Sequence, residues 1–146
     1  MKNILVALEL NDEEMSNRLV EEAARLALAF NAKCWLIHIA APEPDFVGYQ
    51  VGPQYIRDLL AEDLKEDHKR IQSYSQRLKQ ENVNTEGLMI QGPTVESIIE
   101  EIQKLKIDLL VLGNKHHGIL YSTFVGSVTE DILEKVSIPV YLIPEK

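Results

Sequence analysis

The chain has 146 residues, which suits a single domain with one hydrophobic core. Lysine and arginine number 15 against 23 aspartates and glutamates, so the net charge is −8. That sign argues against nucleic acid as the main partner, because affinity for a phosphate backbone comes from clustered cations.

Cysteine use and hydropathy favour a cytoplasmic protein. The single cysteine, Cys34, cannot form an internal disulfide, which fits a reducing compartment, and we interpret it as a buried core thiol. No apolar run approaches the length needed to cross a bilayer, so we expect no membrane partner. The first apolar run stops at Glu9 without a small-residue cleavage site, so it predicts a strand rather than a signal peptide.

The first third of the chain alternates between strand and helix patterns. The near-continuous apolar run from Ile4 to Leu8 is typical of a buried parallel strand, and Asn11 or Asp12 can cap the helix that follows. Lys33 to Ala40 reads as a second strand. The helix between them carries an apolar stripe at Leu19, Val20, Ala23, Ala24, Leu26, Ala27 and Phe30.

The middle of the chain repeats this alternation. Residues 41–53 hold several prolines and glycines and predict a long loop, and a long helix with one apolar face follows, from Ile56 to Leu78. Gly87 to Ile90 predicts a third strand. After a turn, Thr94 is predicted to cap the next helix.

The last third predicts two more strands around a helix. Ile107 to Leu112 reads as the fourth strand, and Pro139 to Pro144 reads as a fifth strand bounded by prolines, as edge strands often are. Ser127 and Glu130 form a capping box for the intervening helix. Its predicted buried stripe is Val128, Ile132, Leu133 and Val136. The whole pattern predicts one α/β domain over residues 1–146, with an open parallel sheet.

The segment from Gly113 to Ser127 is the strongest functional signal. It follows a buried strand, is polar and punctuated by glycines, and ends where a helix begins. Such a strand, loop and helix start direct backbone N–H groups and the positive end of a helix toward an anion. Phosphate is the commonest such anion, so the sequence predicts a nucleotide binder.

Other site chemistries have less support in the sequence. His116 and His117, with His38 and His68, lack the spacing of metal ligands, so we expect no metal site. Ser127 has no nucleophile elbow around it and reads as a helix cap that donates to a phosphate. No acid–base pair stands out, so we expect no enzyme, beyond slow hydrolysis of bound ATP.

Five segments, in this order and spacing, resemble the universal stress protein family over essentially the whole chain. They are residues 4–9, 36–39, 108–113, 126–130 and 138–140. The resemblance implies a Rossmann-like sheet of five strands in the order 3-2-1-4-5, with helices on both faces. It also implies a ligand site between strands one and four, where the strand order reverses.

Many members of that family bind ATP through the motif Gly-x2-Gly-x9-Gly-(Ser or Thr), and others lack both the motif and the binding. Gly113, Gly126 and Ser127 fit the motif, but His116 takes the place of its second glycine. Histidine tolerates left-handed backbone better than most residues and can donate to a phosphate, yet its side chain can also block the site. Glu9 stands where the family ordinarily has an aspartate.

The resemblance implies a role for each matching position. Leu112 and Ile39 would border the adenine, and backbone groups near Ala7 and Ile39 would read its edge. Glu9 would contact the ribose or a magnesium ion. The other predicted contacts of the nucleotide are Leu8, Gly113, Asn114, Lys115, His116, Gly126, Ser127 and Val128. The cofactor would be ATP or another adenine nucleotide, with Mg²⁺ as an option.

Two functions follow from these expectations. The first is a small cytoplasmic ATP-binding protein that regulates a stress response, and the second is an interaction module that has lost nucleotide binding. In both, the apolar residues Val140, Tyr141, Leu142 and Ile143 of the fifth strand are predicted to pair antiparallel with a second copy. The alternative is that these side chains pack on the protein's own helices.

Overall fold

Five parallel strands form one sheet, in the predicted order β3-β2-β1-β4-β5. The computed structural model describes residues 1–40, 54–114 and 128–145, and for 54–61 only the backbone. The strands are β1 (Asn3–Ala7), β2 (Lys33–Ala40), β3 (Thr85–Gln91), β4 (Leu109–Asn114) and β5 (Val140–Pro144). The helices are α1 (Glu13–Phe30), α2 (Gln54–Gln80), α3 (Thr94–Lys104) and one over 128–135.

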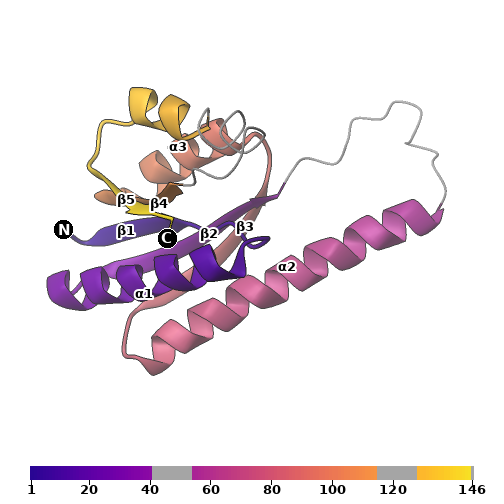
Figure 1. Ribbon diagram of the computed structural model, residues 1–146, viewed down its shortest axis with the longest axis horizontal. Coiled ribbons are helices and arrows are strands. Elements are labelled where there is room, and N and C mark those ends of the chain that lie inside the picture. The colour runs from indigo at the N-terminus through magenta and orange to yellow at the C-terminus, as the bar shows by residue number, and fades with distance from the viewer. Residues whose placement is uncertain (41–53, 115–127, 146) are drawn as a thin grey trace.

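The sheet is covered on both faces. Helices α1 and α2 lie on one face, and α3 and the helix over 128–135 lie on the other (Figure 1). Successive strand residues point to opposite faces, so the core has two halves. Ile4 and Val6 pack toward α1 and α2, whereas Leu5 packs with Ile98 and Ile132 on the opposite face. Because β1 is buried on both faces, its sequence is a continuous apolar run rather than an alternating one.

Asp12 is the N-terminal cap of α1. Of the two predicted caps it is Asp12 whose Oδ1 accepts the Met15 backbone N–H, at 3.0 Å. The helix ends at Asn31, which takes the left-handed conformation with φ of 51°. Most of the predicted apolar stripe is buried, whereas Phe30, the last residue of α1, is half-exposed.

Two further details differ from the prediction. Thr94 is the first residue of α3 and not its cap, because Pro93 before it takes the extended cap conformation and offers no side-chain acceptor. Leu133 is exposed rather than buried. Neighbouring residues of a helix point about 100° apart, and Ile132 already faces the core.

The interpretation of Cys34 as a core thiol is confirmed. Its side chain is fully buried in the half of the core under α1 and α2, and burial raises the pKa of the thiol to about 12. No helix in the part of the chain that the structure describes is long and apolar enough to cross a membrane.

Candidate functional site

A cavity of about 340 Å³ lies at the carboxyl ends of β1, β2 and β4. Helix α1, which follows β1, covers one face of the sheet, and the helix over 128–135, the next described helix after β4, covers the other. Adjacent strands whose connections diverge in this way open a crevice, which is the usual ligand site of such sheets. The volume is within the range of small-molecule pockets.

Seven of the predicted site residues line this one cavity. They are Ala7, Leu8, Glu9, Ile39, Leu112, Gly113 and Val128. Asn114 ends β4 but does not line the cavity, and its backbone carbonyl accepts the Glu145 N–H at 3.1 Å. The predicted contacts Lys115, His116, Gly126 and Ser127 lie outside the described residues.

Eight further residues, which were not predicted from the sequence to belong to the site, also line the cavity. They are Leu10, Asn11, Ile37, His38, Thr94, Ile98, Thr129 and Ile132. Isoleucines from three different elements supply apolar walls, and hydroxyl, amide, imidazole and carboxylate groups supply the polar part. An apolar pocket with a few polar groups suits a flat base joined to a polar sugar. Leu10 and Asn11 directly follow Glu9, so continuing past the end of the first strand would have found them.

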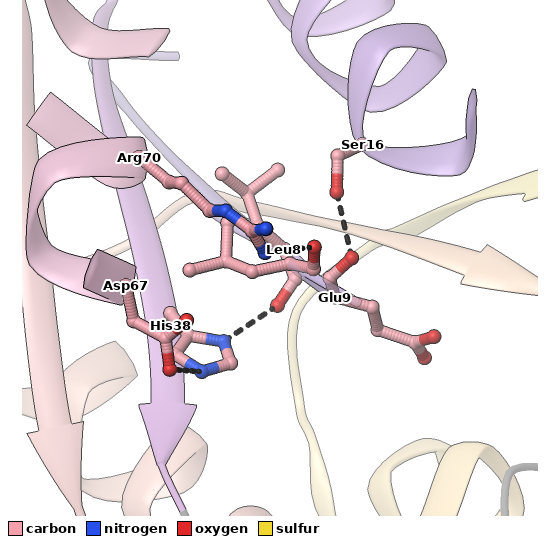
Figure 2. Close-up of polar contacts among 7 residues, drawn as sticks. Leu8, Glu9, Ser16, His38, Asp67 and Arg70 are labelled. Atoms are coloured by element: carbon pink, nitrogen blue, oxygen red, sulfur yellow. Dashed lines mark hydrogen bonds and ion pairs between the residues drawn. The ribbon is translucent and has the colours of Figure 1, made fainter. Parts of the chain in front are cut away.

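Three side chains from three elements hold the backbone just after β1. The carbonyl oxygens of Leu8, Glu9 and Leu10 are consecutive acceptors. The ring Nδ1 of His38, on β2, lies 3.3 Å from the Leu8 oxygen, and the Ser16 hydroxyl, on α1, donates to the Glu9 oxygen at 2.7 Å (Figure 2). Arg70, on α2, donates to the Leu10 oxygen at 3.1 Å. We call these three side chains the carbonyl clamp.

His38 also connects the clamp to α2. Its Nε2 lies 3.6 Å from Oδ2 of Asp67, and both side chains are largely buried. Figure 2 shows the imidazole between Asp67 and Leu8, with the Glu9 carboxylate directed away from this cluster. Among the residues that the structure describes, no group of three or more histidine, cysteine, aspartate or glutamate side chains could hold a metal ion.

Gly113, the first glycine of the predicted motif, lies against α1. A Cβ at this position would lie 2.8 Å from Sδ of Met15, closer than such atoms can approach without a shift. The lack of a side chain therefore lets the end of β4 pack against the first turn of α1. This packing role is independent of any ligand.

Comparison with known proteins places the chain in a family. The model of the Universal stress protein family matches residues 1–144. A universal stress protein from Thermus aquaticus is 27% identical over 144 residues, which cover 97% of this chain and 98% of that protein.

Two similar solved structures share the fold at lower identity. One is a universal stress protein in complex with cAMP, 20% identical, with a TM-score of 0.71 over 98% of this chain and 96% of the other. The second is the universal stress protein from Archaeoglobus fulgidus in complex with dAMP, 18% identical, with a TM-score of 0.70 over 98% of each chain. With the family match spanning nearly every residue, the chain belongs to the universal stress protein family.

Proposed function

We propose that this protein binds an adenine nucleotide in the cavity at the ends of β1 and β4, and that it acts as a cytoplasmic regulator in a stress response rather than as an enzyme. One observation carries the proposal. Residues predicted from separate parts of the sequence, on β1, β2, β4 and the helix over 128–135, line a single cavity where the strand order reverses.

The chemistry of the cavity supports an adenine nucleoside. Ile39 and Leu112 offer apolar contact to a base, and backbone groups of the strand-end residues that line the cavity would pair with its edge. The Glu9 carboxylate can accept hydrogen bonds from ribose hydroxyls or bind Mg²⁺, whose preferred ligands are oxygens. Two proteins of the same fold were solved with adenine nucleotides, cAMP and dAMP.

The phosphates would extend toward the segment after β4. The predicted contacts there, Lys115, His116, Gly126 and Ser127, stay predictions, as does the preference for ATP over AMP. The helix over 128–135 follows this segment directly, and a helix N-terminus favours negative charge. A nucleotide with its base against Leu112 would therefore have its phosphates near that helix.

Calorimetry with AMP and with ATP, each with and without Mg²⁺, tests the proposal. Thr94→Trp should abolish binding, because Thr94 is exposed at the edge of the cavity and an indole there would occupy it. Glu9→Gln should weaken binding by about tenfold or more through loss of a charged acceptor. Glu96→Gln is the matched control, since it removes the same charge from an exposed position on α3 and should leave affinity unchanged.

Two outcomes would count against nucleotide binding. Failure of the parent protein to bind AMP or ATP at millimolar concentration would favour the interaction module instead. Equal affinity in the parent and Thr94→Trp proteins would show that any nucleotide binds elsewhere. Circular dichroism of each variant establishes that it is folded.

We also propose that the protein forms a homodimer through β5. This strand is at the edge of the sheet, and its Tyr141 and Leu142 are 38% and 36% exposed. An apolar edge strand presents unpaired backbone groups to a second chain. Ile143, in contrast, is buried in the protein's own core, so only part of the strand's apolar surface is available.

Sedimentation equilibrium of the parent and of Tyr141→Lys tests the dimer. The substitution places a charge at the proposed interface and should give a monomer. The Tyr141 hydroxyl also donates to Glu22 at 3.2 Å, so Tyr141→Phe is the control that removes this hydrogen bond without adding charge, and it should stay dimeric. A parent protein that is monomeric at micromolar concentration would refute the dimer.

A further inference from the structure

We propose that helix α2 positions Glu9 for the nucleotide, although no α2 side chain that the structure describes lines the cavity. The inference rests on the proposed function, since Glu9 is there the group that contacts the ribose or Mg²⁺. Two routes connect α2 to the backbone around Glu9. Arg70 donates to the Leu10 carbonyl directly. Asp67 lies 3.6 Å from Nε2 of His38, whose Nδ1 lies 3.3 Å from the Leu8 oxygen.

The segment that follows Glu9 borders two cavities. A second cavity of about 540 Å³ lies between α1 and α2, on the other side of this segment. Leu10 and Asn11 line both cavities, although Leu10 is 5% exposed and packs in the core under α1 and α2, as does Leu8. Hydrogen bonds to the three carbonyls act together with this packing to fix the backbone from which the Glu9 side chain extends.

The carbonyl clamp acts on both neighbours of Glu9. His38 and Arg70 bind the residues immediately before and after it, and Ser16 binds Glu9 itself. The Glu9 oxygen also accepts the Asp12 N–H at 3.0 Å, which joins the clamp to the cap of α1. A shift of α2 relative to the sheet would thus change the direction of the Glu9 carboxylate in the cavity.

Arg70 and Arg77 offer a matched comparison. Both extend from α2 toward the cavity between the helices, but Arg77 binds side chains of α1, Asn17 and Glu21, rather than the backbone after β1. Arg70→Met should lower AMP affinity by about fivefold, the value of one hydrogen bond. Arg77→Met removes the same charge and should leave affinity within twofold. Arg70→Lys keeps a donor and should restore most of the loss.

Two replacements of His38 separate its two contacts. The amide nitrogen of asparagine can take the place of Nδ1, so His38→Asn keeps a donor for Leu8 but loses Asp67. The amide nitrogen of glutamine lies near the place of Nε2, so His38→Gln keeps the contact to Asp67 but loses Leu8. If the Leu8 carbonyl is the contact that positions Glu9, His38→Gln should weaken AMP binding about fivefold and His38→Asn less.

Amide hydrogen exchange gives a readout that needs no nucleotide. The Leu8 N–H donates to Ile37, and the Asp12 N–H donates to Glu9, at 2.8 and 3.0 Å. Both should exchange several-fold faster in Arg70→Met and His38→Gln. The Lys33 N–H, bonded to Lys2 at the other end of β1, should keep its parent rate.

The outcomes distinguish this inference from the proposed function. If the parent binds no AMP, the proposed function fails, and the exchange rates alone then decide whether α2 orders the Glu9 backbone. Unchanged exchange and affinity in both Arg70→Met and His38→Gln would overturn the inference. An equal loss of affinity in Arg70→Met and Arg77→Met would also overturn it, because it would show an effect of charge rather than of position.

Discussion

The contact between Gly113 and Met15 predicts that a side chain at position 113, the first glycine of the motif, destabilises the protein. An alanine methyl at 113 would lie 2.8 Å from Sδ and 3.0 Å from Cγ of Met15, which is 3% exposed. Overpacking a core lowers the unfolding free energy by about 2 kcal/mol. Replacing glycine also restricts the unfolded chain, which raises the unfolding free energy by about 0.7 kcal/mol. Gly113 is within β4, where alanine fits the backbone without strain, so Gly113→Ala should lower the unfolding free energy by about 1.3 kcal/mol.

The sign of this effect should reverse when Met15 is shortened. Met15→Ala alone should cost about 3 kcal/mol because it leaves a void under β4. In that background the added methyl meets no sulfur and keeps only the entropic gain, so Gly113→Ala should stabilise by about 0.7 kcal/mol. The two changes should therefore couple by about 2 kcal/mol.

Urea unfolding of the four proteins in this double-mutant cycle measures the coupling. Val95→Ala, on the opposite face of the sheet, is the control background in which Gly113→Ala should keep its destabilising effect. Additive effects of Gly113→Ala and Met15→Ala would refute the packing argument. Because the methyl would face Met15, the double variant should also keep AMP affinity. A large loss of affinity would mean instead that the ligand needs the bare backbone at 113.

Three other predictions concern stability and reactivity. The Lys2 and Asn3 N–H groups lower the pKa of Asp108 below its ordinary 3.8. Asp108→Asn should therefore lower the unfolding free energy in urea at neutral pH, by less than about 1 kcal/mol because solvent screens a carboxylate so close to the surface. The difference in unfolding free energy between the parent and Asp108→Asn proteins should disappear as the pH falls through the lowered pKa, because the native carboxylate is then protonated. A difference that does not change with pH would contradict this prediction. Cys34 should not react with a disulfide reagent near pH 8 until urea unfolds the protein, and rapid native reaction would show that burial does not protect it. Ser75→Ala should stabilise by about 1 kcal/mol in thermal unfolding, because the buried hydroxyl has no partner among the described residues, and a loss of stability would reveal one.

The sequence predicts the elements well because their signals are local. Buried strands read as apolar runs, and the second strand, Lys33–Ala40, has the predicted bounds. The errors arise where local rules compete. Thr94 is a good cap by residue type, but the extended Pro93 takes that place. Leu133 was predicted to be buried because it is one of several apolar residues in its helix. Its side chain points about 100° away from that of Ile132, which faces the core, and so it is exposed.

The candidate site was predicted less completely than the fold. Glu9 and Gly113 were found because strand ends and motif glycines are visible in the sequence. His38 and Thr94 were not assigned to the cavity, because their place at its wall depends on how β2 and α3 meet the sheet. His38 was considered only as a metal ligand, whereas the structure pairs it with Asp67.

The sequence by itself determined the order of strands and helices along the chain, because residue spacing within an element encodes its period and its buried face. The general rule for open parallel sheets then predicted a cavity at the carboxyl ends of the strands. Only the tertiary structure decided which side chains hold the Glu9 backbone. Arg70 and Leu10 are 60 residues apart, as are Arg77 and Asn17. Such contacts depend on where the crossovers place α2 against α1, and no local pattern specifies that distance. For the same reason, the contact between Gly113 and Met15 becomes visible only when β4 and α1 are packed together.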